Sequence, residues 1–192
     1  MRFISEWHIG VTVFFVLSGF LLAYRYAETP LKSKKSYLKY ILLRIARIFP
    51  LYWILLSFYF LDQQYSKGVD TYFLHYSLFY SLFEKYSISG IVQAWSLAVE
   101  FFFYLLSPLL FLLLKKNWKY CILFLTGFFF LGWGIGSVLH FFNGNPKGFL
   151  YPLKFLMGST FFGRSMEFFF GMLLAYLMKQ PNEIQYLKKL GK

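Results

Sequence analysis

Trp95-Ser96-Leu97-Ala98-Val99-Glu100 opens a largely apolar run that continues to Leu114. The run is about 20 residues long, the length at which an α-helix crosses a bilayer, and Glu100 is its single charge. An ionisable group at membrane depth costs roughly 2.5 kcal/mol or more unless it faces a partner or water, which makes Glu100 a functional candidate. Ser96 lies four residues earlier on the same helix face, so a hydroxyl and a carboxyl group are predicted side by side. The alternative is that Glu100 reaches headgroup water near the helix start or pairs with an arginine of a neighbouring helix.

The composition is that of an integral membrane protein. Of 192 residues, 58% are hydrophobic, 25% aromatic and 15% charged, and several apolar runs reach spanning length. The net charge of +12 falls in blocks between those runs, a pattern that encodes membrane topology and not nucleic-acid binding. The single cysteine, Cys121, excludes an internal disulfide framework. The three histidines, His8, His75 and His140, lack partners at ligand spacing, so we expect no metal site.

The apolar runs predict an all-α, polytopic transmembrane helix bundle with about five spanning helices, near residues 9–24, 36–61, 95–114, 120–142 and 157–178. A sixth segment, 72–83, is too short to span and is predicted to lie in the interface or to re-enter the membrane. Its tyrosines suit the headgroup belt, and they also suit stacking on sugar rings. Inner segments hold 14 basic residues against six outside, which predicts an outer N-terminus and a cytoplasmic C-terminus.

Two arginines mark the second predicted helix, for which Ser36 is a candidate N-cap and in which Pro50 is expected to cause a bend. Arg44 and Arg47 are three residues apart, so both guanidinium groups share one face at the inner boundary of the membrane. Two planar guanidinium groups make a suitable clamp for phosphate or pyrophosphate. We therefore expect both to face a shared cavity. The alternative is that they only anchor the helix at the interface.

Small residues and one charge pair predict contacts between helices. Ser18-Gly19 permits close approach of a neighbouring backbone, and so do four glycines of the fourth predicted helix, Gly127, Gly132, Gly134 and Gly136. In the last predicted helix, Arg164 and Glu167 are three residues apart, and we expect them to form a local ion pair.

Four stretches of the sequence resemble the integral-membrane acyltransferase-3 family. Residues 10–21 resemble its most recognisable helix, residues 40–52 contain an Arg-x-x-Arg segment, residues 95–108 contain a Ser-x-x-x-Glu segment, and residues 168–175 are similar to a later helix. The resemblance implies transfer of an acyl group, often acetyl, from acyl-CoA to a hydroxyl group of a surface glycan or a lipid-linked sugar. It also implies a multi-pass protein of the inner (plasma) membrane.

The resemblance also implies roles for the candidate residues. Arg44 and Arg47 would hold the phosphates of acyl-CoA on the cytoplasmic side. Glu100 would orient a basic histidine or the acceptor hydroxyl near the outer side, with Ser96 as its hydrogen-bond partner. We therefore expect Glu100 to point into the bundle towards a polar group.

The sequence departs from the family pattern at its start. Members begin with a helix in which a histidine, the proposed general base, follows an arginine by eleven residues, and no such pair occurs here. His8 lies just before the helix that resembles the family's second, so the catalytic role is not transferred to it. The expectation is that residues 1–192 form a partial domain that lacks the first helix and is not a competent enzyme alone. A non-catalytic remnant or a binding subunit is the alternative function.

Overall fold

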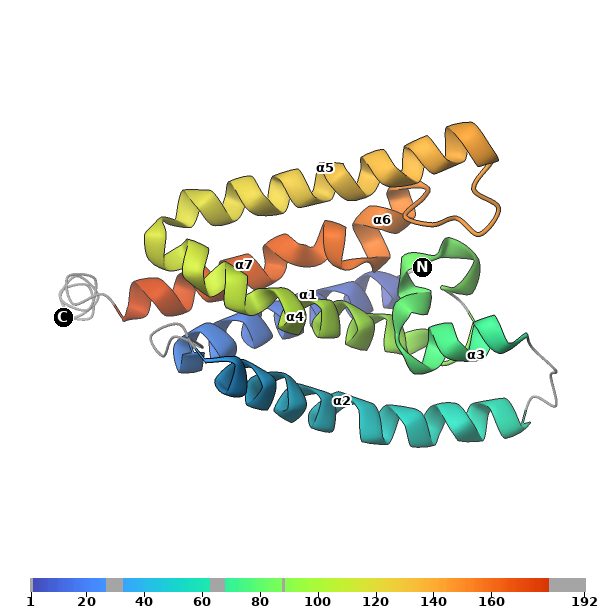
Figure 1. The fold of residues 1–192 in the computed structure, drawn as a ribbon, viewed down its shortest axis with the longest axis horizontal. Coiled ribbons are helices and arrows are strands. Elements are labelled where there is room, and N and C mark those ends of the chain that lie inside the picture. Colours follow the sequence, from blue (N-terminus) through green and yellow to red (C-terminus); the bar gives the residue numbers. More distant parts are fainter. Residues whose placement is uncertain (1, 27–32, 63–67, 88, 180–192) are drawn as a thin grey trace.

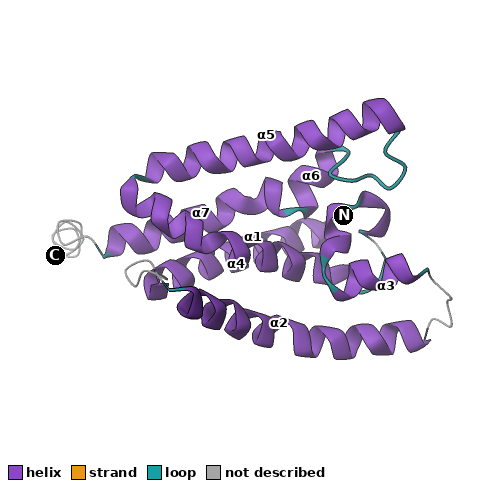
Figure 2. Cartoon of the chain, in the orientation of Figure 1, coloured by secondary structure: helices purple, strands orange, loops and turns teal. Residues whose placement is uncertain are grey.

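The computed structural model describes residues 2–26, 33–62, 68–87 and 89–179, with side chains omitted for residues 2–8 and 62. These residues form helices, shown in Figures 1 and 2, and one isolated β-bridge between Phe83 and Phe149. The helices are α1 (Arg2–Tyr26), α2 (Lys34–Asp62), α3 (Val69–Tyr76), η1 (Phe79–Leu82), η2 (Glu84–Tyr86), η3 (Val92–Ala94), α4 (Trp95–Lys116), α5 (Trp118–Asn143), α6 (Leu153–Ser159) and α7 (Phe161–Met178).

Five helical segments are long and apolar enough to cross a membrane: Ile9–Tyr26, Lys34–Leu61, Val92–Lys116, Trp118–Asn143 and Leu153–Met178. The predicted fold class and number of spans are therefore confirmed. Large apolar side chains are exposed on the outside of the bundle, among them Phe58, Leu123 and Phe141. Such a surface is stable only against lipid or further apolar helices.

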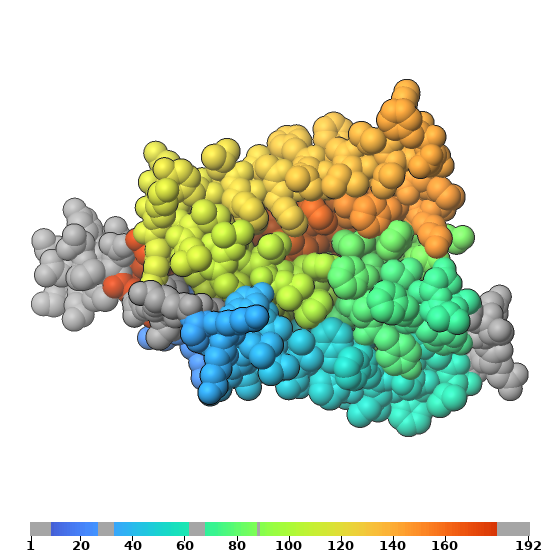
Figure 3. Space-filling view, in the orientation of Figure 1, coloured from blue at the N-terminus to red at the C-terminus, as the bar shows by residue number. Residues whose placement is uncertain are grey.

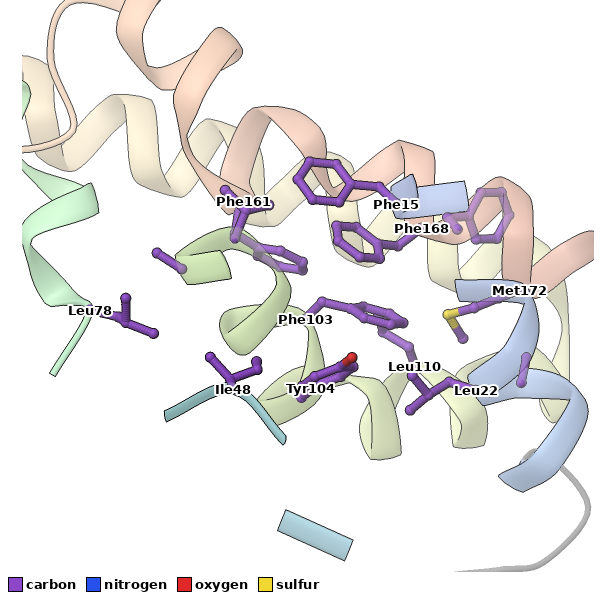
Figure 4. Packing of buried hydrophobic residues seen from close by; sticks show 14 of the residues in the cluster. Phe15, Leu22, Ile48, Leu78, Phe103, Tyr104, Leu110, Phe161, Phe168 and Met172 are labelled. Atoms are coloured by element: carbon purple, nitrogen blue, oxygen red, sulfur yellow. The ribbon is translucent and has the colours of Figure 1, made fainter. Parts of the chain in front are cut away.

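The spans α1, α4 and α7 form the centre of the bundle, with α5 along one side and α2 along the other (Figure 1). Three stacked rings from the central helices lie within the core: Phe168 of α7 lies 4.6 Å from Phe15 of α1 and 4.2 Å from Phe103 of α4, centroid to centroid (Figure 4). Offset stacking of this kind stabilises aromatic pairs beyond the burial of their surface. The core therefore joins helices that lie far apart in the sequence.

Glycines bring α1 and α7 into backbone contact. A Cβ atom added to Gly19 would overlap the backbone of Phe168, and one added to Gly171 would overlap the carbonyl oxygen of Val16. The expected packing role of Ser18-Gly19 is thus confirmed. In α5, Gly132 and Gly136 make similar close contacts with Phe162 and Leu150, whereas Gly127 and Gly134 face open space. The prediction of a four-glycine packing surface is correct for only two of the four.

The second span starts earlier than predicted. The Ser33 hydroxyl accepts a hydrogen bond from the Ser36 backbone N–H at 3.0 Å, so α2 begins at Lys34 and Ser36 is not its N-cap. A serine side chain that caps an N–H group three residues later is the usual start of a helix, and Ser33 is placed to do so. Pro50 lies inside α2, which changes direction along its length in Figure 1.

The last span is divided in two, and the prediction of one helix over residues 157–178 is wrong in this respect. Thr160 has extended backbone angles (φ −117°, ψ 160°) between α6 and α7, and its hydroxyl donates to the Leu156 carbonyl at 2.7 Å. This bond satisfies one of the carbonyl groups that the end of α6 leaves free. Gly163 then packs against the backbone of Met157, which closes the two pieces together.

The segment before α4 forms short helices at the end of the bundle opposite the chain's basic loops (Figure 1). Leu78 adopts a left-handed conformation (φ 65°) just after the end of α3, so residues 72–83 do not form one continuous helix. His75 is fully buried in this segment, with Nδ1 2.8 Å from the Thr71 carbonyl and Nε2 3.0 Å from the Ser89 hydroxyl. These contacts tie α3 to the turn that precedes η3.

The N-terminal helix is longer than predicted. It begins at Arg2, so the backbone of His8 is helical and does not lie in a loop before the span. The side chain of His8 lies outside the described residues, as do three of the basic residues counted as inner, Lys188, Lys189 and Lys192.

Candidate active site

Glu100 lies in the interior of the bundle on α4 and is 3% exposed. Its Oε1 atom accepts a hydrogen bond from the Ser18 hydroxyl of α1, at 3.2 Å, and another from the Tyr104 hydroxyl one turn further along α4. The expectation that Glu100 points into the bundle towards polar groups is confirmed. The described residues contain no ion pair between Glu100 and an arginine.

Ser96 does not pair with Glu100, so that prediction is wrong. The Ser96 hydroxyl instead donates to the backbone carbonyl of Gln93 at 3.0 Å. Ser96 is the second residue of α4, next to the short helix η3, and a free carbonyl three residues back is a nearer acceptor than a carboxylate one turn ahead. Ser96 and Glu100 do share the lining of one cavity.

The second oxygen of Glu100, Oε2, has a different environment. The Ser18 and Tyr104 hydroxyl groups both donate to Oε1, and no described residue donates a hydrogen bond to Oε2. Oε2 has no hydrogen-bond donor among the described residues but is not fully enclosed by protein, so it has access to space. Because Glu100 lines two cavities, that space is the cavity interior.

The first cavity, of about 520 Å³, lies between α1 and α2. It extends from Glu100 towards the end of the bundle where Arg25 lies in the last turn of α1 and Lys34 begins α2, which we call the basic end. Arg44 and Arg47 both line it, so the expectation that they face a shared cavity is confirmed. Its full lining comprises Phe14, Leu17, Ser18, Leu21, Leu22, Tyr24, Arg25, Arg44, Arg47 and Glu100.

The second cavity, of about 450 Å³, extends from Glu100 towards the opposite end of the bundle, where Ile91 and Gln93 precede α4. Its full lining comprises Phe14, Arg47, Ile48, Leu51, Tyr52, Leu55, Ile91, Gln93, Ala94, Ser96, Leu97 and Glu100. Phe14, Arg47 and Glu100 line both cavities, so the two adjoin beside the carboxylate. On the face shown in Figure 3, side chains of α2 meet those of α4.

The two arginines of α2 have different environments. The Arg44 guanidinium lies over the rings of Tyr26, Tyr40 and Tyr104, at 5.5 Å from each centroid, and donates to the Tyr26 hydroxyl at 3.2 Å. Contacts of a guanidinium with aromatic faces hold the charge in a defined place. Arg47 is exposed and makes no hydrogen bond or ion pair with the part of the chain that the structure describes. Arg47 is therefore free to bind a ligand, whereas Arg44 is held in position.

Three further residues of this site are not predicted from the sequence. Arg25 lines the first cavity, whereas in the sequence it is one of the 14 basic residues of the inner segments that indicate topology. Ser18 was assigned to helix packing, although its hydroxyl contacts Glu100. Tyr104 was part of an apolar run, and its position four residues after Glu100 was the signal that could have identified it.

The predicted ion pair between Arg164 and Glu167 is confirmed, with 3.3 Å between Arg164 Nε and Glu167 Oε1. Thr12 of α1 joins it, because its hydroxyl accepts from Arg164 at 3.2 Å and donates to Glu167 at 3.3 Å. Arg164 also lies 5.7 Å from the ring centroid of Trp95. Neither Arg164 nor Glu167 lines either cavity. Through Thr12 and Trp95, this cluster instead connects α7 to α1 and α4.

Comparison with known proteins identifies the chain. A family model described as an acyltransferase domain, that of the acyltransferase-3 family, matches residues 7–189. Neither a curated protein nor a solved structure matches. The match covers all five spans, both cavities and Glu100, and the chain belongs to the acyltransferase-3 family of membrane proteins.

Proposed function

We propose that this protein transfers an acyl group, acetyl in the first instance, from acyl-CoA to a hydroxyl group of a surface glycan or a lipid-linked sugar. The observation that carries the proposal is the meeting of two cavities at Glu100, one leading towards each end of the bundle. Such an arrangement lets a donor and an acceptor approach one carboxylate from opposite sides of a membrane.

The donor is assigned to the first cavity because its lining carries three arginines, Arg25, Arg44 and Arg47. CoA brings several phosphate groups, and a planar guanidinium binds a phosphate through two parallel hydrogen bonds. Arg44 supplies a fixed positive charge and Arg47 one that can adjust to the ligand. We place the basic end in the cytoplasm, following the positive-inside rule, with the N-terminus outside and the C-terminus inside the plasma membrane.

The acceptor is assigned to the second cavity, which reaches the opposite end. At the junction of the two cavities, the acceptor hydroxyl oxygen forms a bond to the acyl carbonyl carbon, and the carbon–sulfur bond of the thioester breaks. The hydroxyl proton passes to a base, and CoA leaves as a thiolate that takes up a proton. Oε2 of Glu100 is the group at the junction that orients the hydroxyl, or a histidine base where one is supplied.

Arg47→Lys should raise the KM for acyl-CoA about tenfold with little change in kcat. Lysine keeps the charge but loses the two-pronged hydrogen bond, and a charged hydrogen bond contributes about 1.5 kcal/mol or more. Kinetics of label transfer from acyl-CoA measure this, on the chain itself and on the chain extended upstream by a helix of the family's type.

Lys39→Arg is the control, since Lys39 is an exposed cation of α2 that lines neither cavity. It should leave the KM unchanged. If Arg47→Lys also leaves the KM unchanged, Arg47 only anchors α2 and the assigned donor site is wrong.

A further inference from the structure

Two hydroxyl groups from different helices hold one and the same oxygen of Glu100. Ser18 donates from α1 at 3.2 Å and Tyr104 donates from α4. A free carboxylate can exchange its two oxygens by rotating about its last side-chain torsion, which is broad and roughly two-fold. Two donors on one oxygen fix the plane of the carboxylate, so that the other oxygen, Oε2, is held where it has access to the cavities.

Each donor is itself held in place. The Tyr104 side chain is fully buried, and its ring lies 5.5 Å from the Arg44 guanidinium. Ser18 precedes Gly19, where the backbones of α1 and α7 are in contact, so the helix that carries the hydroxyl cannot shift easily. The hydrogen bonds therefore connect Glu100 to rigid parts of the bundle.

We propose that Ser18 and Tyr104 are positioning residues, which fix the carboxylate of Glu100 so that Oε2 faces the junction of the two cavities. This inference rests on the proposed function. A misplacement of about 1 Å in a reacting group can cost 10²-fold in rate. The expected consequence of losing a donor is a lower kcat, with substrate binding unchanged.

The chain offers a matched control for Tyr104. Tyr40 is also buried, its ring lies 5.5 Å from the same Arg44 guanidinium, and its hydroxyl shares a hydrogen bond of 2.6 Å with Ser107. Its hydroxyl does not contact Glu100. Removing either hydroxyl leaves the ring and the cation–π contact, so the two variants carry a similar structural cost and differ in their effect on the carboxylate.

Tyr104→Phe should lower kcat about 10-fold to 100-fold and leave the KM for acyl-CoA within about twofold of the unmodified protein. Tyr40→Phe should leave both constants unchanged. Ser18→Ala should lower kcat in the same way, and Ser18→Thr should restore it, because the hydroxyl is kept and the extra methyl group has the first cavity beside it. Equal losses in Tyr104→Phe and Tyr40→Phe would mean that the Tyr104 hydroxyl is only structural.

A double-mutant cycle separates positioning from packing. In a Glu100→Gln background, Tyr104→Phe should change the residual rate by less than about twofold, because the group that the hydroxyl positions is gone. The same fold loss in both backgrounds overturns the proposal.

An infrared measurement tests the contact without any enzyme assay. The difference spectrum between the unmodified protein and Glu100→Gln isolates the carboxylate band of Glu100. The carboxylate loses a hydrogen bond in Tyr104→Phe, whereas in Tyr40→Phe all of its hydrogen bonds remain. A shift in the first variant alone supports the proposal, and an unshifted band in Tyr104→Phe overturns it. If the band shifts as expected but neither the chain itself nor the chain extended upstream transfers an acyl group, the proposed function fails and the positioning of the carboxylate stands.

Discussion

Glu100→Gln is expected to lower acyl transfer about 10²-fold to 10⁴-fold in the form of the chain that is active, with or without an upstream helix, while the helices insert and fold normally. Glutamine keeps the shape of the side chain and can still accept hydrogen bonds from Ser18 and Tyr104 through its carbonyl oxygen. It lacks the charge and cannot take or direct a proton at the cavity junction. The kcat for label transfer from acyl-CoA to a hydroxyl acceptor measures the loss.

Glu84→Gln serves as the control for removal of a carboxylate. Glu84 is exposed at the end of the bundle opposite the basic end and lines neither cavity. Its replacement should leave transfer unchanged. Full activity in Glu100→Gln would reduce Glu100 to a structural residue, and equal Tm values for both variants would exclude unfolding as the cause of any loss.

Gly171→Ala is expected to destabilise the bundle and to lower its Tm in detergent by about 5 °C or more. The added methyl group would overlap the Val16 carbonyl oxygen, so α1 and α7 must separate along their closest contact. Overpacking of this kind typically costs 1–3 kcal/mol. Thermal unfolding followed by circular dichroism measures the change.

Gly127→Ala is the matched substitution, because Gly127 also lies within a spanning helix and nothing lies within 4 Å of an added Cβ atom. Alanine is a better helix former than glycine, so this variant should be as stable as the unmodified protein or slightly more stable. Equal destabilisation by both substitutions would show that the backbone contact between α1 and α7 does not carry the stability inferred here.

The sequence predicts those features that depend on composition or on residues close together in the chain. The five spans follow from the lengths of apolar runs and the basic blocks between them. The ion pair of Arg164 and Glu167 follows from a spacing of three within one helix. The shared cavity face of Arg44 and Arg47 follows from the same spacing.

Features that depend on packing between distant segments were not predictable in the same way. Ser18 and Glu100 are 82 residues apart, and only the arrangement of α1 against α4 brings the hydroxyl to the carboxylate. The pairing of Ser96 with Glu100 failed because a local backbone carbonyl competes for the same hydroxyl.

Helix interruptions were missed for a related reason. Leu78 and Thr160 stop helices within apolar or aromatic stretches that contain no proline at those positions. At Leu78 the chain adopts a left-handed conformation that leucine rarely takes, and tertiary contacts of the buried segment offset its cost. Propensity alone gives no sign of such a stop.

The central claim is that a donor at the basic end and an acceptor at the opposite end meet at Glu100. Sealed vesicles with the protein in a known orientation test it most directly, with labelled acyl-CoA and a hydroxyl acceptor added to chosen sides. We expect transfer when acyl-CoA is on the side of Arg25 and the acceptor on the side of Gln93, and loss of that transfer in Glu100→Gln. Equal transfer with both substrates confined to one side, or transfer that is unaffected by Glu100→Gln, would contradict it.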